Sequence, residues 1–104
     1  MSGFEYEGKE YELKFNQKRI EMIEVVTDMP TMAALRKYQG MLSLQALKVY
    51  FGYTVKEVGS DTFLKPKQGM EMAEVLIESE GYTDVCGLVL ESLERDCPFF
   101  FRQG

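Results

Sequence analysis

The sequence predicts an α+β domain that is mostly helical, with an N-terminal β-hairpin followed by about four α-helices. Two observations lead to this prediction. Apolar and polar residues alternate over residues 4–15, which is typical of half-buried strands. After residue 16, apolar residues recur every three or four positions, which places them on one face of a helix. We therefore expect one domain over residues 1–104, consisting of a hairpin (4–15), a helical part (16–97) and an apolar C-terminal tail (98–104).

The alternation at the N-terminus predicts a hairpin with one aromatic face. Glu7-Gly8-Lys9 separates the two strands, and Gly8 supplies the positive φ that a tight hairpin turn demands. A lone hairpin is marginally stable in water, so its aromatic face must be covered. We expect that face to pack against the last helix or the one before it. The face comprises Phe4, Tyr6, Tyr11, Leu13 and Phe15.

Capping and breaking residues mark the helices. Asn16 and Ser43 can cap helices, and Pro66 suits a first helical turn. A helical stretch after Asn16 has a weak, β-branched end. Firmer helices are expected over about 31–39, 43–52 and 66–79, and from a cap at Thr83 or Asp84 to residue 97. Residues 53–65 remain open between strand and helix. The spacing places Leu44, Leu47 and Phe51 on one inner stripe, and predicts close packing at Gly87.

The charge balance excludes some classes of function. Twelve Lys and Arg residues face seventeen Asp and Glu residues, which gives a net charge of −5. Nucleic-acid binding needs a positive face, and the longest basic cluster, Lys18-Arg19 beside Lys14, is too small to form one. Anionic membranes are disfavoured for the same reason, and the sequence has neither a membrane-spanning stretch nor a signal peptide. We expect no nucleic-acid partner, no membrane partner and a cytoplasmic protein.

The residue types that catalysis needs are largely missing. The chain has no histidine, which removes the commonest general base and the commonest metal ligand. Cys86 and Cys97 are too far apart on one helix for a disulfide and match no zinc pattern, so we expect two reduced, buried thiols. We predict no enzyme, no cofactor and no metal. The carboxylates three residues apart are expected to be solvated helix faces: Glu71 with Glu74, and Glu91 with Glu94.

Methionines and a run of phenylalanines indicate protein binding. The chain has seven methionines, whose flexible side chains suit varied apolar partners. Three consecutive phenylalanines cannot share one buried face, so at least one should be exposed or bound to another chain. The alternatives are that the methionines fill the core and that the tail folds back over the hairpin. The candidate partner-binding residues are Phe99, Phe100, Phe101, Met41 and Met72.

Three stretches carry a resemblance to a known family. They are Phe4–Asn16 (FEYEGKEYELKFN), Leu42–Tyr53 (LSLQALKVYFGY) and Pro66–Gly69 (PKQG). Together with the apolar last helix, they resemble the tail assembly chaperones of long-tailed bacteriophages and prophages. Small members of that family open with a hairpin of the form x-G-K-x-Y-x-L-x-F and continue as helices. The resemblance covers most of the chain.

The resemblance implies a non-enzymatic role in the cytoplasm of an infected bacterium. Such chaperones coat the long tape measure protein, keep it soluble and recruit tail tube subunits, so these two proteins are the expected partners. Self-association is left open. The residues alone also leave two alternatives. One is a small acidic secretion-type chaperone or adaptor that holds one partner segment as a stable dimer. The other is an enzyme subunit whose site another chain completes.

Overall fold

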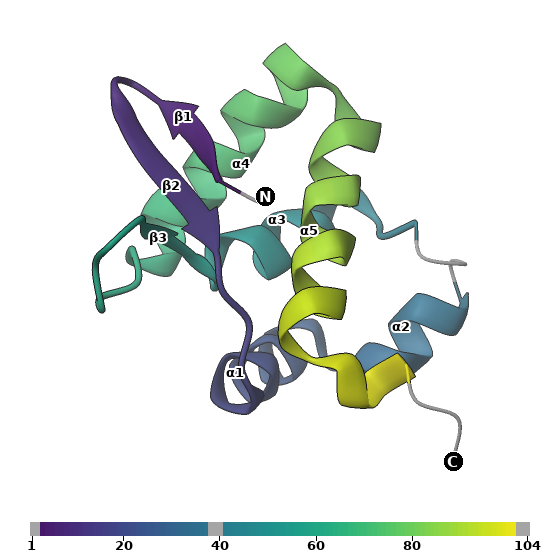
Figure 1. The fold of residues 1–104 in the computed structure, drawn as a ribbon. Helices are drawn as coiled ribbons and strands as arrows, with labels where there is room; N and C mark the ends of the chain where they lie inside the picture. Colours follow the sequence, from purple (N-terminus) through teal and green to yellow (C-terminus); the bar gives the residue numbers. More distant parts are fainter. Residues whose placement is uncertain (1–2, 38–40, 102–104) are drawn as a thin grey trace.

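The computed structural model describes residues 3–37 and 41–101, and shows a small sheet beside a group of helices (Figure 1). The predicted α+β fold, dominated by helix, is confirmed. The expected helical residues 38 and 39 and the tail residues 102–104 lie outside the described ranges. The elements are β1 (Phe4–Tyr6), β2 (Lys9–Leu13), α1 (Gln17–Thr27), α2 (Thr31–Lys37), α3 (Leu44–Gly52), β3 (Val55–Glu57), α4 (Pro66–Glu80), α5 (Tyr82–Asp96) and the 3₁₀ helix η1 (Pro98–Phe101).

The predicted hairpin forms, but its turn is one residue shorter than expected, because Lys9 belongs to β2. Phe4 pairs with Tyr11, and Tyr6 pairs with Lys9, so the turn contains only two residues. These residues, Glu7 and Gly8, have φ angles of 50° and 84°. Two positive φ values are what a type I′ turn needs, and this turn matches the twist of the strands that it joins.

A third strand, β3, settles the segment that the sequence left open. It pairs antiparallel with β2, so that Leu13 lies opposite Val55 and the strand order is β1-β2-β3. Lys56 lies opposite Glu12, and its Nζ forms an ion pair with a carboxylate oxygen of Glu12 at 2.8 Å, which links β3 to β2. Three strands give the hairpin a support that two strands lack in water.

The caps predicted for two helices are present, and the one predicted for α5 is not. The side chain of Asn16 accepts a hydrogen bond from Arg19 N at 2.8 Å, and that of Ser43 accepts one from Ala46 N at 3.1 Å. Helix α5 begins instead at Tyr82, without a side-chain cap. Gly81, with a φ of 99°, turns the chain directly from α4 into α5, so the predicted caps Thr83 and Asp84 lie inside the helix.

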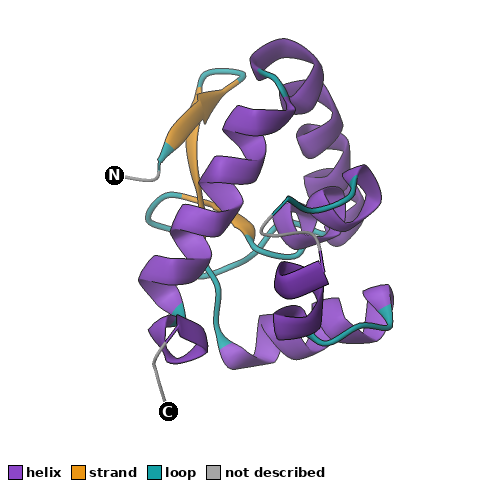
Figure 2. Ribbon diagram, turned by 90° about the vertical axis from the view of Figure 1, so that its right-hand side faces the viewer, coloured by secondary structure: helices purple, strands orange, loops and turns teal. Residues whose placement is uncertain are grey.

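Helix α3 lies at the centre of the core and contacts α1, α4 and α5, while the strands gather at one side of the helices (Figure 2). Leu47 and Phe51 are fully buried, but Leu44 is 53% exposed, so its predicted place on the inner stripe is wrong. The Phe4 ring lies 5.7 Å from the Phe51 ring. The hairpin therefore packs on α3 as well as near the last two helices.

Helices α3 and α4 cross at a pair of glycines. A Cβ atom on Gly69 would lie 2.5 Å from the carbonyl oxygen of Gly52 and 2.8 Å from its Cα. Only glycine allows so close a backbone approach. Gly87, where the sequence predicted close packing, is exposed and has nothing near its Cβ position, so that prediction is wrong.

Candidate protein-binding surface

The three phenylalanines that follow α5 are held on one 3₁₀ turn. Pro98 ends α5, and Phe100 N donates a hydrogen bond to Cys97 O at 3.2 Å. Phe99 and Phe101 are 47% and 43% exposed, whereas Phe100 packs against the core. The prediction that at least one ring is exposed is confirmed. The rings of Phe99 and Phe100 lie 4.9 Å apart, so the turn presents a compact aromatic group.

An open groove lies beside this turn, and we call it the C-terminal groove. It has a volume of about 510 Å³ and is bounded by α2, α5 and η1. Leu35 and Leu90 are partly buried and form its apolar floor with Phe101. The residues that line the groove are Leu35, Leu90, Glu91, Glu94 and Phe101.

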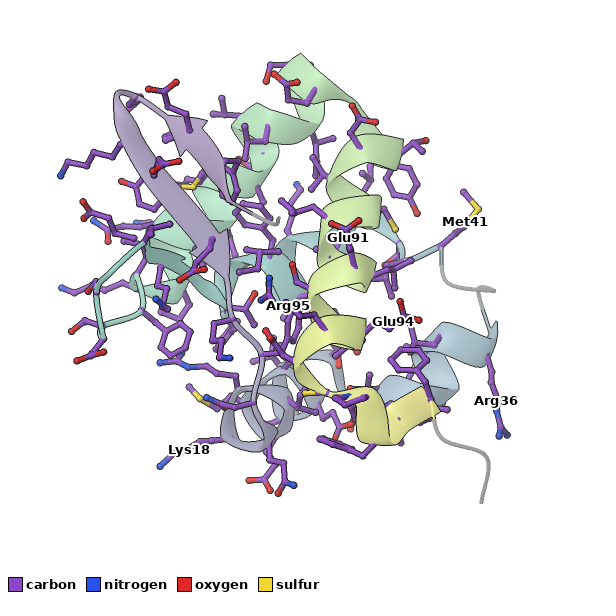
Figure 3. The ribbon with its side chains drawn as sticks, viewed as in Figure 1. Lys18, Arg36, Met41, Glu91, Glu94 and Arg95 are labelled. Atoms are coloured by element: carbon purple, nitrogen blue, oxygen red, sulfur yellow. The ribbon has the colours of Figure 1, made fainter. Side chains whose placement is uncertain are left out.

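The rim of the C-terminal groove that α5 provides is acidic. Glu91 and Glu94 are exposed and lie along the same stretch of α5, while Arg36 on α2 points away from that helix (Figure 3). Within the described ranges, Glu94 makes no ion pair. The charge of Glu91 acts on Arg95 and contributes to raising its pKa, although the hydrogen bond to Asp96 is the main cause.

A polar clamp fixes the end of α5 that carries the aromatic turn. The almost fully buried carboxylate of Asp96 accepts hydrogen bonds from Phe15 N at 2.9 Å and from Arg95 Nε at 2.7 Å, with Lys14 Nζ 3.5 Å away. Arg95 also donates to Leu13 O at 2.6 Å. Burial raises the pKa of Asp96, but these hydrogen bonds and positive charges outweigh it and hold the pKa below the ordinary value.

The two methionines proposed for partner binding have different positions. Met41 is exposed in the segment before α3 and points into solvent (Figure 3), but it does not line the C-terminal groove. Met72 is buried in the core, on α4 near Tyr6 and Tyr11. The expectation that Met72 serves a partner is therefore wrong for this structure, because its side chain fills space beneath the hairpin.

The structure adds two residues to the site that were not candidates from the sequence. Leu35 and Leu90 are partly buried apolar residues on α2 and α5, and only the fold brings them to one groove. A second exposed apolar surface, on α1, was not among the candidates from the sequence. It contains Met22, Val25 and Val26.

The residues that the structure describes hold no group of three or more metal-ligand side chains. None of the helices within residues 3–37 and 41–101 combines the length and apolarity of a bilayer-crossing helix. Comparison with family models, with curated proteins and with solved structures finds no match to this chain.

Proposed function

We propose that this chain is a non-enzymatic protein-binding chaperone that assists tail assembly of a long-tailed bacteriophage or prophage in the host cytoplasm. In this proposal it binds the tape measure protein, keeps it soluble and recruits tail tube subunits. The observation that carries the protein-binding role is the pair of half-exposed rings of Phe99 and Phe101, beside an apolar groove. The tail-assembly role rests on the resemblance of the hairpin and helices described above.

Physical chemistry supports a surface that binds protein. Full burial of a phenylalanine side chain is worth about 1.5–3 kcal/mol, so rings left half exposed retain much of that free energy for a partner. Exposed aromatic clusters are typical of the centres of protein–protein interfaces. The short η1 turn and the Asp96 clamp hold the rings in place, which lowers the entropy cost of binding.

The proposal predicts a gene and a solubility effect. A gene for a very long helical protein should lie beside the gene for this chain. Co-expression of the two should move that long protein from the insoluble to the soluble fraction. The double substitution Phe99→Ser with Phe101→Ser should weaken this effect, because it removes both exposed rings while leaving Phe100 in the core.

Two other exposed apolar residues provide a matched control. Val58 and Val75 are 46% and 48% exposed, close to the values for the two rings, and neither lines the C-terminal groove. The variant Val58→Ser with Val75→Ser should solubilise the long protein as well as wild type does. Equal loss in both double variants, or no solubilisation by the wild type, would rule the proposal out.

A further inference from the structure

The shape of the C-terminal groove favours a macromolecule over a small ligand. Its floor of Leu35, Leu90 and Phe101 is apolar, and the groove is open to solvent on one side instead of enclosed. Small-molecule sites bury most of the surface of their ligand in a concavity. An open groove of about 510 Å³ suits side chains that another protein presents from its own surface.

The charge on the rim favours a basic occupant. Glu91 and Glu94 are three residues apart, so they project from the same face of α5 beside Leu90. Glu94 makes no ion pair within the described part of the chain. The chain carries a net charge of −5, which adds to the negative potential at this rim. A lysine or arginine at the rim gains attraction, whereas an acidic group is repelled.

The backbone around the groove favours a helix over an extended peptide. Among the residues that the structure describes, the lining belongs to α2, α5 and η1, and no strand edge borders the groove. An extended segment laid on these apolar side chains would bury its own N–H and C=O groups without partners, which is costly. An α-helix satisfies its backbone internally and presents only side chains to the groove.

We propose that the C-terminal groove binds an amphipathic α-helix of a partner protein. Apolar residues at helical spacing on that helix contact Leu35, Leu90 and Phe101, and lysine or arginine residues beside them meet Glu91 and Glu94. The inference rests on the proposed chaperone function and gives the chemistry of the segment that is held. That segment is a helical stretch with one apolar face and basic flanks.

Synthetic peptides of about 20 residues, long enough to form helices, test this inference. One peptide carries a leucine stripe flanked by lysines, the second carries the same stripe flanked by glutamates, and the third is a scramble of the first. Anisotropy of the labelled peptides should show the lysine-flanked helix binding about tenfold more tightly than either control, because two ion pairs and the apolar stripe act together. Raising the salt concentration should reduce the difference in affinity between the lysine-flanked and glutamate-flanked peptides.

Charge reversal locates the site. The variant Glu91→Lys with Glu94→Lys should bind the lysine-flanked peptide more weakly than wild type does, and the glutamate-flanked peptide more tightly. The variant Glu71→Lys with Glu78→Lys changes two exposed glutamates on α4 and shifts the net charge equally. This control should keep the preference of the wild type, which separates a local effect from one of total charge.

Three results would overturn the inference. In the first, both double variants lose affinity for the lysine-flanked peptide equally. In the second, the wild type binds the glutamate-flanked peptide as tightly as the lysine-flanked one. In the third, the wild type is a dimer and the variant with Glu91→Lys and Glu94→Lys is a monomer. The last result would assign the groove to a second copy of the chain. If solubilisation of the long protein persists in any of these cases, only the groove chemistry fails. If the peptides behave as expected without solubilisation, only the chaperone function fails.

Discussion

At the scale of single residues, Asp96 joins segments that lie far apart in the sequence. Its carboxylate and the neighbouring Arg95 bind Leu13, Lys14 and Phe15, which lie 81 or 82 positions away. Nothing in the sequence singles Asp96 out, because an aspartate beside an arginine in a last helical turn is an ordinary surface pattern. Its importance comes from burial and from hydrogen bonds that only the fold creates.

The lowered pKa of Asp96 predicts an acid-sensitive contribution to stability. The ionised form is favoured in the folded protein, so it stabilises the fold above the ordinary pKa of 3.8, and this contribution is lost as the pH falls through the lower folded-state pKa. Asp96→Asn should lower the free energy of unfolding by about 1.5–3 kcal/mol at pH 7, the range for hydrogen bonds to charged groups. It should also flatten the loss of stability below about pH 4.

Urea unfolding at a series of pH values measures both effects, and Glu94→Gln is the control. Glu94 lies on the same helix but is exposed and has no ion pair within the described residues. Its replacement should leave the free energy of unfolding within about 0.5 kcal/mol of wild type. If Asp96→Asn followed the same pH curve as wild type, the clamp would have no part in acid stability.

The glycine pair at the crossing of α3 and α4 gives a second prediction at this scale. Gly69→Ala should lower the free energy of unfolding by about 1–3 kcal/mol, because its methyl group would meet the backbone of Gly52. Gly87→Ala, an identical change at an open helical position, should raise it by about 0.5–1 kcal/mol. We expect the melting temperature of Gly69→Ala to lie below that of wild type and the melting temperature of Gly87→Ala to lie above it. A shift in the same direction would contradict the close approach.

At the scale of elements, the sequence predicted those features that local chemistry determines. The hairpin, the positive φ at Gly8 and the caps at Asn16 and Ser43 depend on neighbouring residues alone, and they are confirmed. The strand β3 could not be predicted, because its three residues take their conformation from β2, more than 40 positions earlier. The groove could not be predicted either, because it too depends on contacts between segments far apart in the sequence. The exposure of the aromatic run was predictable, but the groove beside it depends on where the fold places α2 relative to α5 and η1.

Helix α3 allows a direct test of its orientation. Leu44 and Leu47 share a helix and a residue type, but they are 53% and 0% exposed. Leu47→Ala should lower the free energy of unfolding by about 2–5 kcal/mol, because it leaves a cavity in the core. Leu44→Ala should change it by less than about 0.5 kcal/mol. Chemical denaturation of both variants measures the difference, and equal losses would show that α3 is rotated from its described position.

At the scale of the whole molecule, the two thiols report on global unfolding. Cys86 and Cys97 are reduced and buried, and burial together with the charge of Asp96 raises the pKa of Cys97. A raised pKa lowers the fraction of reactive thiolate, so alkylation of the folded protein should be slow. Mass spectrometry should find two labels after denaturation without a reductant, and few labels under native conditions. Failure to add any label after denaturation would mean that the two cysteines had formed a disulfide.

The link between residues 13–15 and the end of α5 also has a consequence for the order of events during synthesis. The ribosome adds about 5–20 residues per second, so Arg95, which donates a hydrogen bond to Leu13 O, is added roughly 4–16 seconds after Leu13. The residues of β3 are added about halfway through that interval, and α5 is completed only at its end, so the N-terminal strands lack the cover of α5 throughout it. The hairpin therefore cannot be fully covered until α5 has been synthesised, so a protein proposed to keep other chains soluble itself exposes an aromatic surface while it is being made.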